Sequence, residues 1–295
     1  MSKSHKFTGS FVALITPMQA DGAVDFPALD RLVDFHLANQ TDGIVVLGTT
    51  GEAPTITKAE FPVVISHVLK RVNKKIPVIA GAGKNATAET VHLAQEVSQL
   101  GVDGLLIVTP YYNRPTQEGL YQHYMKIAEA VDLPQILYNV PGRTGCDLLP
   151  ATVARLTKAM PHIIGIKEVV SVERVKQLVE QCGDIAIYCG DDPNNLPYLQ
   201  AGACGLISVT ANVAPKALHD MCAACFAGDL KQAEKIHQQL GLLNKDLFIE
   251  SSPAPTKWVL QQMGLIENNL RLPLVPLSDR SQAAVREAMQ VAEII

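Results

Sequence analysis

The stretch Pro161-His-Ile-Ile-Gly-Ile-Lys-Glu168 indicates both the fold and the site. Residues 163–166 form an apolar run without helical spacing, which is typical of a strand buried on both faces. Lys167 follows this run directly, and an ammonium group is costly to bury unless it is paired or loses its proton. A neutral lysine amine can form a Schiff base with a carbonyl compound. The alternative is a lysine that extends from the strand end to solvent.

Seven other short apolar runs share this character, and helix-like segments separate them. The eight runs cover residues 11–15, 43–47, 76–80, 104–108, 135–138, 163–166, 185–189 and 204–209. The clearest helical segments cover residues 26–39, 58–72, 88–100, 118–130 and 171–182. Alternating strands and helices imply parallel pairing, and eight such units predict an α/β fold of the (β/α)₈ (TIM) barrel type. A doubly wound open sheet is the alternative, although no Gly-rich dinucleotide fingerprint follows the first run.

The pattern becomes purely helical after the eighth unit. Helical periodicity covers residues 230–243, 256–263 and 281–295, and prolines occupy the joins. We therefore predict a barrel catalytic domain at residues 1–228 and a small C-terminal helical domain at residues 229–295. We expect this appendage to pack against the barrel or against a neighbouring subunit.

The composition excludes several classes of function. The chain has 295 residues, 47% of them hydrophobic, and a formal net charge of -4, with no basic block that would favour nucleic acid or a membrane surface. No stretch has the character of a signal segment or a membrane span, and the six cysteines fit reduced core residues. We expect a cytoplasmic protein without metal or cofactor. Cys222-Ala-Ala-Cys225, with His219 before it, fits one face of a helix better than a metal site.

Active sites of such barrels lie at the carboxyl ends of the strands, so the residues after each run are candidates. The second run leads into Gly48-Thr-Thr-Gly-Glu52, whose hydroxyls and backbone N–H groups suit a small carboxylate, although a plain tight turn is the alternative. The fourth leads into Thr109-Pro-Tyr-Tyr-Asn-Arg114, whose tyrosines could instead serve packing or an interface. The fifth leads into Tyr138-Asn-Val-Pro-Gly-Arg-Thr-Gly145, which offers a phenol and a guanidinium suited to a second carboxylate.

The remaining candidates narrow the chemistry. Gly190-Asp-Asp192 ends the seventh run, where adjacent carboxylates would repel a phosphate unless they only cap the next helix. The histidines at positions 36, 67, 92 and 123 fall within predicted helices, which disfavours a metal-dependent aldolase. The set therefore predicts a lysine-dependent, aldolase-like barrel that joins an unphosphorylated α-keto acid to a second acid. A non-catalytic barrel that binds an acidic metabolite is the competing hypothesis.

These motifs, together with Ser208-Val-Thr-Ala-Asn212, resemble those of the dihydrodipicolinate synthase family, within the pyruvate-dependent lyase/synthase superfamily. N-acetylneuraminate lyase is the alternative within that superfamily, since it shares the Gly-Thr-Thr-Gly-Glu turn and the lysine. The synthases have an arginine in the strand-five loop that the lyases lack, and Arg143 matches it. The resemblance implies condensation of pyruvate with L-aspartate 4-semialdehyde to 4-hydroxy-tetrahydrodipicolinate, in diaminopimelate and lysine biosynthesis.

The resemblance also implies a role for individual residues. Lys167, Tyr138, Thr49 and Tyr112 match the catalytic set, and Thr50, Arg143, Gly190 and Ile207 match the substrate-binding set. Lys167 would form the iminium with pyruvate, and the other three catalytic residues would relay protons, with Tyr112 supplied by the neighbouring subunit of a tight dimer. Thr50 would hold the pyruvate carboxylate and Arg143 that of the aldehyde, while the backbones of Gly190 and Ile207 line the pocket. The implied assembly is a homotetramer, a dimer of such dimers.

A lysine feedback site maps imperfectly onto the chain. Asn85, Glu89 and Tyr111 match the family's site, whereas Ala53, Lys58 and Phe61 stand where strongly inhibited members have a serine and two histidines. Lys58 would repel an incoming lysine, and Phe61 removes a polar partner. We therefore predict weak or absent inhibition by lysine.

Overall fold

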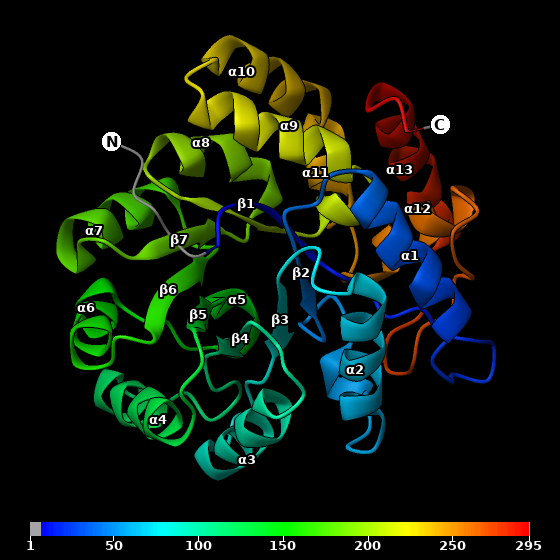
Figure 1. The fold of residues 1–295 in the computed structure, drawn as a ribbon. Helices are drawn as coiled ribbons and strands as arrows, with labels where there is room; N and C mark the ends of the chain where they lie inside the picture. Colours follow the sequence, from blue (N-terminus) through cyan, green and yellow to red (C-terminus); the bar gives the residue numbers. More distant parts are fainter. Residues whose placement is uncertain (1–6, 295) are drawn as a thin grey trace.

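The computed structural model describes residues 7–294, and its eight strands close into one parallel barrel in chain order (Figure 1). The strands are β1 Gly9–Ala13, β2 Gly43–Val46, β3 Val78–Gly81, β4 Gly104–Val108, β5 Gln135–Asn139, β6 Ile163–Glu168, β7 Ala186–Cys189 and β8 Gly205–Ser208. The longer helices around them are α1 Phe26–Ala38, α2 Glu60–Val72, α3 Thr87–Ser98, α4 Gln117–Ala130, α6 Pro150–Ala159, α7 Val172–Cys182 and α9 Pro215–Phe226. The shorter elements are α5 Pro141–Thr144, α8 Asn195–Gln200 and the 3₁₀ turns η1 Ala53–Thr55, η2 Asp192–Asn194 and η3 Thr210–Asn212. The predicted (β/α)₈ barrel is confirmed.

Every strand except β4 differs from its predicted range by one or two residues at one or both ends, and two of these differences have identifiable reasons. β3 begins at Val78 and not at Ile76, because Pro77 has no N–H to donate to the ladder. β6 continues through Glu168, so Lys167 lies within the strand instead of following it. The extra pairing is regular, with Lys167 opposite Tyr138 on one side and Tyr188 on the other.

Apolar side chains fill the barrel interior, and a second, larger core lies between strands and helices. The interior cluster includes Phe11, Val45, Ile79, Leu106, Ile136, Tyr138, Tyr188 and Ile207. Full burial of each aliphatic side chain contributes roughly 1.5–3 kcal/mol. Gly165 shows how closely the strands approach, since a Cβ atom there would lie 2.0 Å from the carbonyl oxygen of Ala186. That position accepts only glycine.

Asp192 has a structural role that the sequence did not indicate. Its buried carboxylate accepts hydrogen bonds from the backbone N–H groups of Val209 and Thr210, both at 2.9 Å, and from Asn195 Nδ2 at 3.0 Å. It therefore joins the ends of β7 and β8 instead of facing a ligand. The capping alternative was wrong, because neither aspartate side chain caps η2, and the unphosphorylated substrate stays a prediction.

The C-terminal segment forms the helices α10 Leu230–Gln239, α11 Gly241–Asp246, α12 Ala254–Gln262 and α13 Asp279–Val291. α10 packs on α9, α13 packs on α11 and α12, and α11 and α12 reach η2 and η3. In Figure 1 these helices gather at one side of the barrel, with α12 and α13 near α1. They thus contact the loops after β7 and β8, at the carboxyl end of the barrel. The division at residue 229 stays a prediction.

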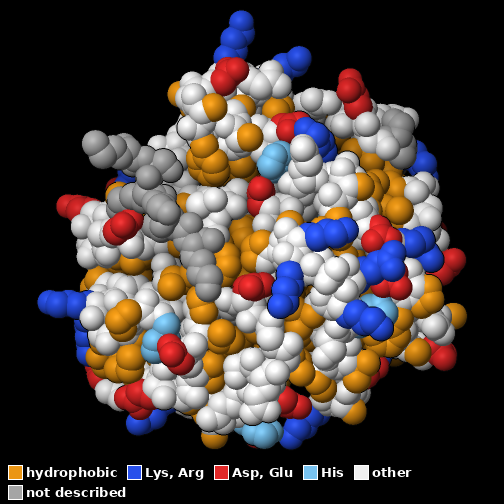
Figure 2. All heavy atoms as spheres, in the orientation of Figure 1, with side chains coloured by type: hydrophobic (Ala, Val, Ile, Leu, Met, Phe, Trp, Pro, Cys, Tyr) orange, Lys and Arg blue, Asp and Glu red, His pale blue; other side chains and the backbone are white. Residues whose placement is uncertain are grey.

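Charged side chains on the outer helices pair with one another. Arg71 on α2 donates to Asp34 on α1, and His67 lies 2.9 Å from Asp30. Figure 2 shows acidic and basic side chains side by side over these two helices. Within residues 7–294, no helix combines the length and the apolar character needed to cross a bilayer.

Candidate active site

Lys167 is buried inside the mouth of the barrel. Lys167 pairs with Tyr138 on β5 and Tyr188 on β7, two members of the interior cluster, so the three side chains form one row that faces the barrel interior. Only 4% of Lys167 is exposed. Nζ lies 4.5 Å from the centroid of the Tyr138 ring. No carboxylate among residues 7–294 is within ion-pairing distance of this amine. The lysine therefore does not extend to solvent, and no ion pair prevents Nζ from attacking a carbonyl carbon.

Gly190 provides the space that the Lys167 side chain occupies. A Cβ atom at position 190 would lie 2.4 Å from Lys167 Cε and 2.8 Å from Val169 Cγ1. Because the nearest atom belongs to the far end of a flexible side chain, a substitution there would displace the amine before it displaced the backbone. Ile207, on β8, is fully buried in the interior cluster.

The residues that alternate with this row point to the outer side of the barrel and form a polar network. Glu168 is fully buried and accepts hydrogen bonds from Asn139 Nδ2, at 3.0 Å, and from the backbone N–H groups of Val169 and Val170. Asn139 Nδ2 also donates to Asp147, and Arg174 on α7 contacts both carboxylates, at 2.8 Å for Asp147 and 3.8 Å for Glu168.

Burial and charge act in opposite directions on the two carboxylates of this network. Burial raises the pKa of Glu168 above its usual value, although its hydrogen bonds and Arg174 act against this. Hydrogen bonds from Arg174 and Asn139 hold the pKa of Asp147 below its usual value. The network fixes the end of β6 to the loop after β5, which contains Arg143.

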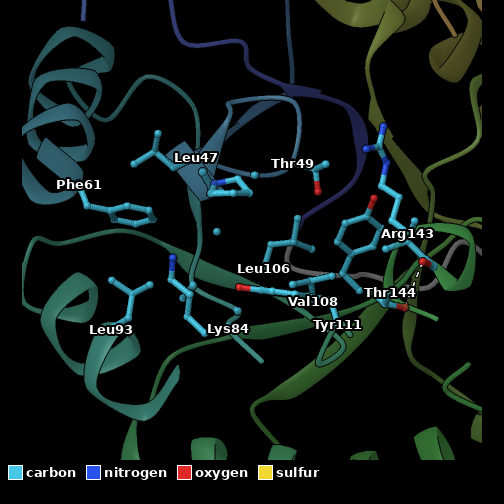
Figure 3. Close-up of a pocket in the computed structure, with 18 residues that line it drawn as sticks. Leu47, Thr49, Phe61, Lys84, Leu93, Leu106, Val108, Tyr111, Arg143 and Thr144 are labelled. Carbon is cyan, nitrogen blue, oxygen red and sulfur yellow. Dashed lines mark hydrogen bonds between the residues drawn. The ribbon is translucent and has the colours of Figure 1, made fainter. Parts of the chain in front are cut away.

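A cavity of about 240 Å³ opens beside this row at the carboxyl ends of the strands. Thr49, Tyr138 and Arg143 line it, and Thr50 is buried outside its lining. Figure 3 shows Thr49 and Arg143 toward one end of the cavity and Phe61, Lys84 and Leu93 toward the other. The predicted hydroxyl, phenol and guanidinium thus line one cavity, and Lys167 lies over the Tyr138 ring without lining the cavity itself.

Tyr112 does not join them. Tyr112 is 90% exposed, and its backbone has a φ of 76°, in the left-handed region that a tyrosine rarely adopts. A hydrogen bond of 3.1 Å from its N–H to the carbonyl oxygen of Thr144 holds the loop in place. Tyr111, in contrast, lines the cavity.

The predicted feedback residues separate into two groups. Ala53, Phe61 and Tyr111 line the cavity. The other three do not line it: Lys58 is exposed with Nζ 3.3 Å from His92 Nε2, Asn85 accepts a hydrogen bond from Asn113 through its carbonyl oxygen, and Glu89 is exposed.

The sequence prediction missed Lys84, a half-buried residue whose Nζ lies 5.7 Å from the centroid of the Phe61 ring. Burial lowers its pKa, while the charge of Glu89 acts in the opposite direction. Lys84 follows β3 in the stretch Gly81-Ala-Gly-Lys84, so the rule that strand ends provide site residues would have found it.

A buried lysine with a phenol, a hydroxyl and a guanidinium, at the carboxyl end of a (β/α)₈ barrel, defines a lysine-dependent, aldolase-like lyase. The comparisons with known proteins agree with this class. Residues 6–292 match the model of the dihydrodipicolinate synthetase family, and the chain belongs to that family. A relative from Methylococcus capsulatus, named 4-hydroxy-tetrahydrodipicolinate synthase, is 52% identical over 97% of this chain and 99% of its own. One from Pseudomonas aeruginosa, with the same name, is 51% identical over 97% and 99%.

Solved structures give the same result. The chloride-inhibited dihydrodipicolinate synthase from Acinetobacter baumannii, complexed with pyruvate, is 48% identical and superimposes with a TM-score of 0.96 over 98% of this chain and all of its own. The dihydrodipicolinate synthase from Aquifex aeolicus is 42% identical, with a TM-score of 0.95 over 98% and 99% of the two chains. The predicted family and enzyme class are confirmed, and the synthase is supported over the neuraminate lyase alternative.

The polar network predicts that Arg174→Met lowers the free energy of unfolding by an amount that depends on pH. Without the guanidinium, the pKa of Asp147 would return toward its usual value and that of Glu168 would rise further. The depressed pKa of folded Asp147 adds stability at pH values above the unfolded pKa of Asp, about 3.9. The raised pKa of folded Glu168 removes stability as the pH rises past the unfolded pKa of Glu, about 4.3. Urea titrations should therefore show a larger loss of unfolding free energy at pH 7 than at pH 4. Arg155→Met, which breaks the exposed Arg155–Glu118 pair, serves as the control and should cost about 0–1 kcal/mol. A loss for Arg174→Met that is equal at both pH values would contradict the assignment.

Proposed function

We propose that the protein condenses pyruvate with L-aspartate 4-semialdehyde to 4-hydroxy-tetrahydrodipicolinate, through a Schiff base at Lys167. The observation that supports this most directly is the buried amine, which lies over Tyr138 without a carboxylate partner in the described residues. The pyruvate bound to the related Acinetobacter enzyme supports the keto acid as substrate. The alternative, a binding protein without catalysis, has no need of a nucleophile at this position.

In the proposed reaction, Lys167 Nζ attacks the keto carbon of pyruvate, and loss of water gives an iminium. The iminium draws electrons from the adjacent methyl group, which loses a proton and becomes the nucleophilic carbon of an enamine. This carbon forms a bond with the aldehyde carbon of the second substrate, whose oxygen takes up a proton. The amino group of that substrate then replaces Nζ at the former keto carbon, which closes the ring and releases the lysine.

The cavity residues suggest how the two carboxylates and the protons are handled. We propose that Tyr138 and Thr49, which both line the cavity, relay protons in the steps at Nζ. Thr50, in the same turn, would hold the pyruvate carboxylate together with backbone N–H groups. Arg143 would hold the carboxylate of the aldehyde, since its guanidinium can bind a carboxylate through two hydrogen bonds.

We propose that Tyr112 acts in the site of a second copy, within a homotetramer built as a dimer of dimers. Its exposed ring on a loop held by the Thr144 hydrogen bond supports this, because a large aromatic side chain so placed suits an interface.

We propose that the barrel, residues 1–228, contains the catalytic residues and that residues 229–295 form the helical domain. The six free thiols support a cytoplasmic location.

We also propose that lysine inhibits the enzyme weakly or not at all. The cavity that Ala53 and Tyr111 line already contains an ammonium, that of Lys84, over the Phe61 ring. A lysine molecule entering there would meet a like charge and one aromatic wall in place of a polar partner. Exposed Lys58, which the family resemblance assigns to the same site, would add a second positive charge.

Reductive trapping tests the proposed nucleophile. Borohydride reduction in the presence of pyruvate should add the mass of one reduced pyruvate at Lys167, and Lys167→Ala should abolish the addition. Gly190→Ala should reduce the rate of trapping at least about tenfold, because the new Cβ displaces the amine. The matched control is Gly142→Ala, where a Cβ meets no atom within 4 Å. An unmodified wild-type protein, or modification at another lysine, would refute the proposal.

Substitution of Arg143 tests its assignment to the second substrate. Arg143→Ala should leave trapping by pyruvate close to that of the wild type, while kcat/KM for the aldehyde falls about 10²-fold or more, because the carboxylate loses a charged partner. Steady-state assays with each substrate varied separately would measure both effects, and Arg155→Ala on the outer face of α6 should change neither. An equal loss for both substrates would show that the role is wrong.

The feedback proposal predicts full activity at lysine concentrations in the micromolar range. Lys84→Ala should increase sensitivity to lysine, because it removes the resident like charge, whereas Lys216→Ala on α9 should not. Initial rates measured against added lysine would decide. Inhibition of the wild type at micromolar lysine would contradict the proposal.

A further inference from the structure

The turn that precedes η1 has a strained backbone. Leu47 and Glu52, at its two ends, have φ values of 52° and 56°, in the left-handed region that only glycine adopts freely. Between them, Gly51 has little room for a side chain, since a Cβ there would lie 3.0 Å from the carbonyl oxygen of Leu14. Thr16 Oγ1 donates a hydrogen bond of 2.7 Å to the carbonyl oxygen of Gly51. Such a conformation persists only when the surrounding structure holds it in place.

The firmest of these restraints comes from the C-terminal segment. Glu52 is buried, and its carboxylate forms an ion pair with Nζ of Lys257 on α12, a residue with no exposed surface. Lys257 Nζ also donates to the carbonyl oxygen of Asn269, at 2.8 Å, and the backbone N–H of Arg271 donates to the second oxygen of Glu52, at 3.2 Å. Burial lowers the pKa of Lys257, and the Glu52 carboxylate opposes that shift.

Arg271 adds a second restraint on the same loop. Its guanidinium donates to the carbonyl oxygens of Thr55, at 2.7 Å, and Gly22, at 2.8 Å, and it forms an ion pair with Glu60 at the start of α2. The segment after α12 therefore bonds to the backbone on the far side of Glu52, as well as to its side chain.

Stability alone is a weak explanation for a buried ion pair. Replacing such a pair with apolar side chains of similar volume is often neutral or stabilising, because the attraction only offsets the cost of removing two charges from water. The pair does fix the position of the turn, since it holds the carboxylate of Glu52, the residue that immediately follows Thr49, Thr50 and Gly51. We infer that Lys257 is a positioning residue: its ion pair with Glu52 holds the turn so that the hydroxyl of Thr50 and the backbone N–H groups of the turn meet the carboxylate of the keto acid.

This inference rests on the proposed function, in which that turn binds pyruvate. It adds that the binding geometry depends on the C-terminal segment, none of whose residues up to position 294 lines the cavity. Loss of the ion pair should therefore weaken the use of pyruvate specifically, while the second substrate, assigned to the loop after β5, is less affected.

The test compares Lys257→Met with the double variant Glu52→Gln/Lys257→Met. The single variant leaves a buried carboxylate without its partner and should lower the melting temperature, whereas the double variant removes both charges and should recover most of that loss. If the pair positions the turn, the double variant should still show a KM for pyruvate raised about tenfold or more, with kcat and the KM for the aldehyde within about threefold of the wild type. Lys216→Met, which breaks the exposed Lys216–Asp220 pair, is the matched control and should change none of these values.

The outcomes separate the inference from the proposed function. A double variant with the wild-type melting temperature and the wild-type KM for pyruvate would overturn the inference, because the turn would then keep its geometry without the pair. Failure of both variants to fold, while Lys216→Met folds, would also overturn it and assign the pair to the fold alone. If the wild type forms no reducible adduct with pyruvate, the proposed function fails, whatever the Lys257 variants show.

Discussion

Parallel pairing of β5 with β6 places Lys167 directly beside Tyr138 inside a closed barrel, and the rest of the site depends on this register. A shift by one residue would exchange the two faces of β6, sending the amine outward and bringing the Glu168 carboxylate inward. In the observed register, the amine meets an aromatic face and the space left by Gly190. The same closure keeps the amine away from bulk water while leaving it next to the cavity.

The alternation of side chains along the strands divides the polar residues into two functional sets. Inward-facing groups are few and meet the cavity, whereas outward-facing groups such as Glu168 and Asn139 bond to the loops and helices behind them. Asp192 does the same for the ends of β7 and β8. These buried carboxylates are satisfied by backbone N–H groups and amides, so they fix the positions of the strand ends without placing negative charge beside the amine.

The C-terminal helices are joined to this arrangement through charge as well as through apolar packing, since Trp258, Val259 and Leu260 belong to the core between strands and helices. The Glu52–Lys257 ion pair and the Arg271 hydrogen bonds connect the last third of the chain to a turn that follows β2. A loop on a barrel rim is otherwise among the more mobile parts of such a fold. Bonds from α12 and the segment after it restrict that mobility at Thr50, assigned to the carboxylate of the substrate, and at Thr49, assigned to the proton relay.

The sequence by itself determined the eight strands, their parallel order, the family and the approach of Lys167, Tyr138 and Arg143 to one end of the barrel. These features follow from local patterns, since a buried strand appears as an apolar run and strand order fixes which ends meet. Only the tertiary structure decided that Asp192 is a bridge between strand ends, that Lys84 lies over the Phe61 ring, and that Glu52 pairs with Lys257. Each of these depends on side chains from distant segments meeting in a low-dielectric interior, and no periodicity in one segment records which partner it will find in another.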